Sequence, residues 1–205
     1  MEQLFHFLMS VHPISTGLQK YLLSVIQVQS LKRKQFLLKA GHICRNIYFL
    51  EKGLVRFFYS KEGIEVSSSF MKENDIVVSV ESFYNRIPSY ENIQALEDCN
   101  LNYISYDHLY TTYREFPEFN WIGRELTQRY YGLSIRQLYG LRNQQATERY
   151  TWLVEQHPEL VLRVPAKYLA SWLGITEVTL SMIKGKRVRY SYKDSKKLGL
   201  RNEKL

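Results

Sequence analysis

The residues best suited to chemistry lie near the C-terminus, in residues 164–187, VPAKYLASWLGITEVTLSMIKGKR. One set recurs at helical spacing and offers the hydrogen-bonding and apolar groups that meet base edges in the major groove of DNA: Thr176, Glu177, Val178, Ser181 and Met182. A second set can contact phosphates: Lys167, Tyr168, Thr179, Lys184, Lys186 and Arg187. We therefore expect this segment to bind double-stranded DNA.

Two short helices joined by a tight turn would position these side chains. Pro165 suits the first position of the first helix, and Gly174 suits the residue just past its end, where a positive φ is needed. Thr176 can cap the second helix. The apolar residues fall where two crossed helices turn inward: Leu169, Ala170, Leu173, Ile175, Leu180 and Ile183. The pattern predicts a helix-turn-helix; the alternative is an ordinary helical hairpin within a core.

The positive charge of the chain is concentrated at the same end. Residues 162–205 contain eleven Lys and Arg but only three acidic residues, whereas residues 1–161 contain 17 of each kind. A neutral body with a basic end indicates a polyanionic partner. DNA fits a helix-turn-helix better than a membrane surface does, since a membrane surface favours an amphipathic helix with a large apolar face.

Several classes of protein are disfavoured by what the sequence lacks. No apolar run approaches about 18 residues, and the N-terminus has no basic region of a signal peptide, so we expect a cytoplasmic protein. Cys44 and Cys99 are isolated, and the histidines are scattered: His6, His12, His42, His108 and His157. We therefore expect no metal, no cofactor and no disulfide framework. No nucleophile, phosphate-loop or paired-carboxylate motif indicates an enzyme.

In the preceding part of the chain, the spacing of apolar residues changes twice. Residues 13–26 show helical spacing, and residues 27–106 consist of short β-branched and aromatic segments separated by turn residues, which predicts an antiparallel sandwich or barrel. A short helix is expected around residues 106–114 and a long one over 117–141. The long helix carries an apolar stripe that would pack along a second copy of the chain or, alternatively, against its own roll: Phe119, Ile122, Leu126, Tyr130, Leu133 and Leu141.

The segment LLKAGHICRNIYFLEKGLVRFFY resembles the cyclic-nucleotide-binding jelly roll. Together with the C-terminal helix-turn-helix, the order of parts resembles the Crp/Fnr family of bacterial transcription regulators over about residues 5–187. The resemblance implies an α+β fold with a jelly-roll sensor (1–115), a dimerisation helix (116–141) and a helix-turn-helix domain (142–205). It also implies a homodimer that regulates transcription on DNA, with RNA polymerase as a further partner.

The chain departs from that family at the nucleotide ligands. The resemblance places Ser79 where the ribose-binding glutamate stands, and Ser89 and Tyr90 where an arginine and a small hydroxyl residue bind the cyclic phosphate. Shifting the register to use Glu81 puts Glu91 at the arginine position, where it would repel a phosphate. We therefore expect that cyclic AMP is not the effector. The candidate effector pocket either binds another small ligand or is filled by its own aromatic side chains. Its residues are Ser79, Glu81, Phe83, Tyr84, Arg86, Ser89 and Tyr90.

Two other functions fit the same sequence. One is a ligand- or protein-binding module whose helix-turn-helix no longer reads DNA, and the other is a cyclic-nucleotide sensor with an unusual pocket. The residues after Arg189 lack an alternating hairpin pattern, so a β-wing beside the helix-turn-helix is expected to be reduced or absent.

Overall fold

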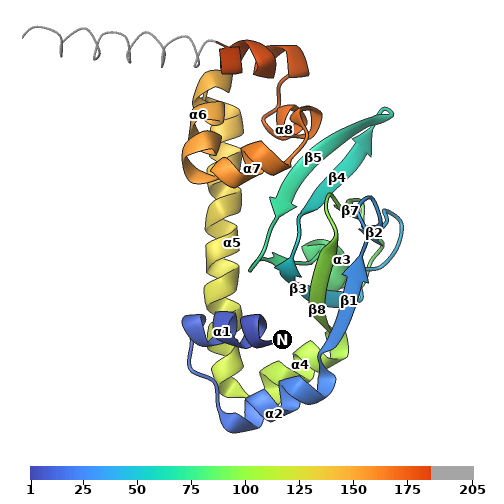
Figure 1. Cartoon of the computed structure of the whole chain (residues 1–205). Coiled ribbons are helices and arrows are strands. Elements are labelled where there is room, and N and C mark those ends of the chain that lie inside the picture. The colour runs from blue at the N-terminus through green and yellow to red at the C-terminus, as the bar shows by residue number, and fades with distance from the viewer. Residues whose placement is uncertain (186–205) are drawn as a thin grey trace, which may run out of the picture. The chain divides into compact units, whose positions relative to one another are not determined.

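The chain divides into two compact units, Met1–Arg136 and Gln137–Leu205, and the computed structural model describes residues 1–185 of it (Figure 1). The first unit is built on an antiparallel β roll, and the described part of the second unit is helical. This mixed architecture, with a long helix following the roll, confirms the α+β fold class predicted from the sequence.

Eight strands of the first unit form two four-stranded antiparallel sheets. One sheet has the order β1-β8-β3-β6, with bounds Gln27–Leu31, Cys99–Ser105, Asn46–Lys52 and Ile76–Val77. The other has the order β2-β7-β4-β5, with bounds Phe36–Leu38, Asn92–Ala95, Val55–Lys61 and Ile64–Met71. The two sheets turn apolar side chains toward one core, which includes Leu50, Val55, Ile93 and Leu101 at 0% exposure.

Local sequence explains the turns between strands. The hairpin that joins β4 to β5 has Glu62 and Gly63 as its two central residues, with φ angles of 53° and 79°. Positive φ at both central positions is the geometry of a type I′ turn, whose twist matches that of the flanking strands. This turn therefore fixes the register of the longest strand pair in the roll.

Four helices accompany the roll in the first unit: α1 (Glu2–Val11), α2 (Thr16–Val25), α3 (Val80–Asn85) and α4 (Tyr106–Glu115). The hydroxyl of Ser15 caps α2, and the hydroxyl of Ser105 caps α4, each by accepting from a backbone N–H three residues later. Helix α1 packs on strand β3, with the Phe7 and Phe49 ring centroids 5.2 Å apart.

Helix α5 (Pro117–Asn143) begins in the first unit and runs on into the second. It is followed by α6 (Ala146–Gln156), α7 (Pro158–Arg163) and α8 (Ala166–Trp172), and residues 177–185 are also helical. Pro158 begins α7 at a position where its missing N–H costs nothing.

The structure differs from the sequence prediction in four places. Helix α1 was not predicted, because its apolar run has no capping side chain. The region predicted to be antiparallel strands, residues 27–106, is interrupted by helix α3 directly after the short strand Ile76–Val77. Pro165 caps α8 instead of lying inside it. Helix α5 ends at Asn143, two residues beyond the predicted end of the long helix, and the irregular link after it is limited to residues 144–145.

Candidate functional site

A tight turn joins α8 to the helix over residues 177–185, where the sequence predicted a helix-turn-helix. Gly174 adopts a φ of +66°, and the N–H of Ile175 donates to the carbonyl of Ala170 at 3.0 Å, which closes the end of α8. The Thr176 hydroxyl then accepts from the N–H of Thr179 at 3.1 Å and caps the helix over residues 177–185. Glycine and threonine thus have the local roles that the sequence predicted for them.

Packing separates an inner from an outer face of this unit. The predicted inner residues Leu169, Ala170, Leu173, Leu180 and Ile183 are buried, and Ile175 is half-buried. Val178 and Met182 are instead 68% and 56% exposed, and Thr176, Glu177 and Ser181 are exposed beside them. The five side chains predicted to meet base edges therefore share one solvent-facing surface.

The predicted phosphate contacts surround that surface only in part. Lys167 is exposed, with its Nζ 4.9 Å from the centre of the Tyr168 ring, and Lys184 is half-buried. The Thr179 hydroxyl lies 2.9 Å from that of Thr176. Lys186, Arg187 and the segment in which we considered a β-wing lie outside the described residues.

Helix α5 has two apolar stripes on opposite faces. Phe119 and Ile122 are buried in the core of the roll, and Leu126 packs against that core. The Tyr130 hydroxyl accepts from the N–H of Ile76 at 2.9 Å. These members of the predicted dimerisation stripe contact their own roll, because the spacing that suits a partner helix suits a neighbouring sheet equally well. Leu133, the fifth member, is 42% exposed.

The second stripe of α5 consists of Tyr131, Ile135 and Leu138, which are 67%, 46% and 46% exposed. Their spacings of four and three residues place them on one face. Tyr131 and Leu133 differ by two positions, about 200° around a helix, so the two stripes face away from each other. Sequence reasoning missed this stripe, although the same periodicity contains it.

The residues of the predicted effector pocket separate into two groups. Ser79, Phe83 and Ser89 are buried, whereas Glu81 is exposed and Tyr84 and Tyr90 are 39% and 62% exposed. Arg86, also exposed, has its guanidinium 4.6 Å from the centre of the Tyr106 ring. The seven residues thus differ in exposure, with three of them buried inside the roll.

The buried group includes a residue that was not on the predicted list. The hydroxyl of Ser79 lies 2.7 Å from Oε1 of Glu91 and 3.1 Å from the hydroxyl of Ser89, which in turn lies 2.8 Å from the backbone carbonyl of Glu91. Burial raises the pKa of the Glu91 carboxyl. The signal in the sequence that could have found Glu91 is its spacing of two and four residues from the apolar Ile93 and Ala95, which places all three on one face of an extended segment.

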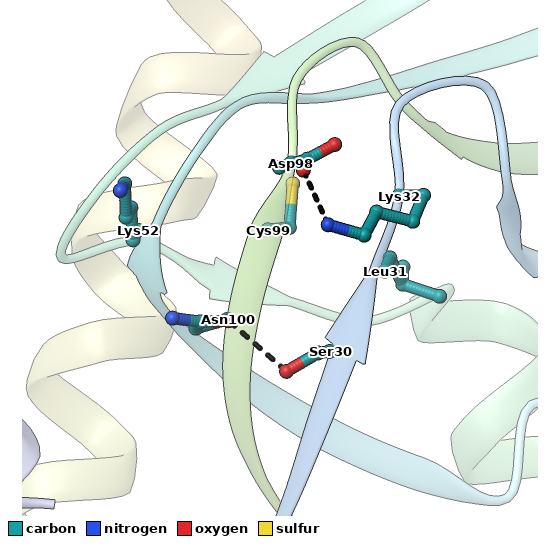
Figure 2. A pocket seen from close by; sticks show the side chains of 7 residues that line it. All are labelled: Ser30, Leu31, Lys32, Lys52, Asp98, Cys99 and Asn100. Atoms are coloured by element: carbon teal, nitrogen blue, oxygen red, sulfur yellow. Dashed lines mark hydrogen bonds and ion pairs between the residues drawn. The ribbon is translucent and has the colours of Figure 1, made fainter.

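A separate hollow of about 330 Å³ lies at the other end of the roll, where β1 runs beside β8 (Figure 2). Four of its polar side chains are paired with one another: Lys32 Nζ lies 2.8 Å from Asp98 Oδ2, and Ser30 Oγ lies 3.0 Å from Asn100 Oδ1. Burial raises the pKa of Cys99 to about 11, so its thiol is a poor nucleophile at neutral pH. The hollow contains none of the predicted effector residues.

Within residues 1–185, no group of three His, Cys, Asp or Glu side chains is arranged to hold a metal ion. No helix in that range combines the length and apolarity needed to cross a membrane.

Comparison with known proteins agrees with the geometry of the roll. Residues 28–116 match the family described as the cyclic nucleotide-binding domain. This range covers the strands β1 to β8 and helix α4, apart from the first residue of β1. The roll is therefore of the cyclic-nucleotide-binding type. No similar sequence was found among the curated proteins.

Solved structures resemble a larger part of the chain. FixK2 from Bradyrhizobium japonicum is 16% identical with a TM-score of 0.69, over 82% of this chain and 86% of that one. A CooA mutant from Carboxydothermus hydrogenoformans is 20% identical with a TM-score of 0.68, over 87% and 81%. A protein from Eubacterium rectale assigned to the Crp/Fnr family of transcriptional regulators is 16% identical, with a TM-score of 0.65, over 88% and 85%. At these identities the likeness establishes the fold.

Proposed function

We propose that this protein is a homodimeric, sequence-specific DNA-binding regulator of transcription of the Crp/Fnr type, without enzymatic activity. The observation that carries the proposal is the separation of faces in the helix-turn-helix. Leu180 and Ile183 hold the helix over residues 177–185 against its own unit, while Val178 and Met182 remain exposed. An exposed helix face with two large apolar side chains and adjacent Ser and Glu groups suits contacts with thymine methyls and base edges.

The second stripe of α5 supports the homodimer. Tyr131, Ile135 and Leu138 form an apolar seam on a helix whose opposite face is already occupied by the roll. A seam of this spacing packs well against a copy of itself. Two copies would present two recognition helices to a two-fold symmetric site, which multiplies the affinity of each.

The residues inside the roll support the proposal that it is a sensor that does not bind cyclic AMP. The resemblance places Ser79 and Ser89 where cyclic-nucleotide-binding members hold the ribose and the phosphate, and neither side chain carries a charge. Glu91, which bonds to Ser79, would meet a cyclic phosphate with like charge. Without a guanidinium to neutralise the phosphate, useful affinity is lost.

The test is selection from a randomised duplex library by the purified full chain at about 150 mM salt, where weak phosphate-only binding largely fails. We expect enrichment of a two-fold symmetric site. Absence of enrichment, together with no salt-dependent binding to any duplex, would favour an interaction module whose helix-turn-helix no longer reads DNA. RNA polymerase would be tested as a partner on the selected site.

A further inference from the structure

Arg149 on helix α6 donates to two backbone carbonyls that belong to the ends of two other helices. Its Nη1 donates to the carbonyl of Gln144 at 2.5 Å, and its Nε donates to the carbonyl of Leu173 at 2.9 Å. Gln144 is the first residue after α5, and Leu173 is the C-cap of α8. One half-buried guanidinium therefore connects α6 to the C-terminal ends of both α5 and α8.

This contact depends on the shape of arginine as well as on its charge. The last carbonyl groups of a helix have no partner within the helix and lie at the negative end of its dipole, so a cation stabilises them. A guanidinium is planar and presents several N–H groups at fixed angles, which lets Arg149 donate to both carbonyls at once. A lysine at this position would keep the charge but would offer a single nitrogen in place of the fork.

The turn after α8 also contacts the end of α5 directly. A Cβ at Gly174 would lie 3.4 Å from Cδ2 of Leu141, so the Leu141 side chain lies against this turn. Leu141 follows Leu138, a member of the outer stripe of α5, by three residues, and all of these residues belong to the second unit. The turn that leads into the helix over residues 177–185 is therefore held against the end of α5.

The link between α5 and α6 is the place where this connection could bend, since only Gln144 and Gln145 separate the two helices. The N–H of Gln145 donates to Oε2 of Glu148 at 2.7 Å, in the capping box that begins α6, and Arg149 follows Glu148 directly. A change of direction at the link would carry Arg149 away from the Gln144 carbonyl. The contact therefore favours one orientation of α6 on the end of α5.

We propose that Arg149 is a positioning residue that fixes the helix over residues 177–185 to the C-terminal end of α5, and that it thereby sets the half-site spacing that the dimer accepts. This role rests on the proposed function, in which that helix is the recognition helix. One added base pair moves a half-site by about 3.4 Å and turns it by about 35°, so a rigid connection discriminates between spacings and a loose one does not.

The first measurement compares the full-length Arg149→Lys variant with the natural protein on three duplexes. These are the selected two-fold site, the same site with one base pair added between its halves, and a single half-site. The variant should bind the single half-site as the natural protein does, because its exposed helix face is unchanged. Its preference for the selected site over the lengthened one should be about tenfold smaller, since a loose connection lowers the effective concentration of the second half-site.

The matched control is Arg136→Lys, the same chemical change at an exposed position of α5, which should keep the spacing preference of the natural protein. Equal losses of affinity by Arg149→Lys on all three duplexes would show a merely structural role. That result, or an unchanged spacing preference in Arg149→Lys, would overturn the inference.

The second measurement needs no DNA. Spin labels on Arg142→Cys and Ser181→Cys report the distance between the end of α5 and the recognition helix by double electron–electron resonance. Excess unlabelled chain is added so that only label pairs within one chain are seen. Cys44 and Cys99 are 3% and 1% exposed, so they should escape labelling.

The distance distribution should be narrow when position 149 is arginine and broader in Arg149→Lys, whereas Arg136→Lys should leave it narrow. An unchanged distribution in Arg149→Lys would overturn the inference. If the natural protein selects a two-fold site but Arg149→Lys behaves like it, only the role of Arg149 is rejected. If the natural protein selects no site, the regulator function is rejected, and the label distances alone decide whether Arg149 fixes the helix.

Discussion

The hydroxyl of Tyr130 on α5 accepts a hydrogen bond of 2.9 Å from the backbone N–H of Ile76 at the start of β6, and it lies 3.4 Å from Oδ1 of Asp75. Burial, followed by the charge of Asp75, raises the pKa of Tyr130 to about 12, so the phenol keeps its proton at neutral pH and can donate to Asp75. A side chain on the long helix thereby satisfies a backbone donor of the roll. The first part of α5 is fixed to the roll by this contact as well as by apolar packing.

Replacing Tyr130 by phenylalanine should destabilise the protein by roughly 1 to 2 kcal/mol, because the Ile76 N–H loses its acceptor while the ring still packs. Urea unfolding at a fixed protein concentration measures the effect. The adjacent Tyr131→Phe is the control, since the Tyr131 side chain is 67% exposed and its change should fall within about 0.5 kcal/mol. Equal effects in both variants would show that the Ile76 contact contributes nothing.

The outer stripe of α5 should control association. Ile135→Asp or Leu138→Asp places a charge in the proposed seam between two copies, where its desolvation is unfavourable, and should convert a dimer into a monomer. Light scattering after gel filtration measures the mass. Leu133→Asp makes the same chemical change at a similarly exposed position on the other face of the helix and should leave the dimer intact. If Leu133→Asp dissociates the dimer and Leu138→Asp does not, the wrong face has been assigned.

Two substitutions in the helix-turn-helix should affect DNA binding differently. Lys184→Ala should weaken binding to every duplex and lower the slope of log affinity against log salt by about 1, since one phosphate contact is lost. Ser181→Ala should instead change which bases are preferred at one position of the site. Fluorescence anisotropy between about 50 and 200 mM salt provides the slopes. The control Lys61→Ala, on the roll, should have the same salt slope as the natural protein. An unchanged salt slope for Lys184→Ala would show that Lys184 does not contact a phosphate.

The stability contributed by Glu91 should depend on pH. Burial raises its pKa above the value in the unfolded chain, so the folded protein holds this proton more tightly. That contribution is fully present below the unfolded value and is lost as pH rises through the raised folded value. Compared with Glu91→Gln, the natural protein should therefore lose stability as the pH rises above the unfolded value of about 4.

Urea midpoints of the natural protein and of Glu91→Gln, followed as the pH rises, measure the difference. The Glu81 carboxylate, which also faces Glu91, should strengthen the trend, and Glu81→Gln should reduce it. The urea midpoint of Glu62→Gln, a change on the exposed turn, should follow the same pH dependence as that of the natural protein. A difference that stays constant with pH, or that grows as pH falls, would contradict a raised pKa.

Features of the fold with local causes were determined by the sequence itself. Gly174 ends α8 because only a residue without a side chain adopts a φ of +66° at little cost, and Thr176 caps the next helix through a hydroxyl three positions before the N–H that it accepts from. The turn at Glu62 and Gly63 has the same kind of local origin. In each case the causative residue lies within about one turn of its effect, so one sequence suffices to predict it.

Tertiary structure alone decided which surfaces face each other. Periodicity predicts that α5 is helical and has an apolar face, but Phe119, Ile122 and Leu126 meet the roll while Tyr131, Ile135 and Leu138 do not, and only packing distinguishes the two stripes. The contact of Ser79 with Glu91 spans a helix and a loop before β7, and no local pattern joins them. Burial and hydrogen bonding between distant segments depend on how the chain folds back, which residue spacing does not specify.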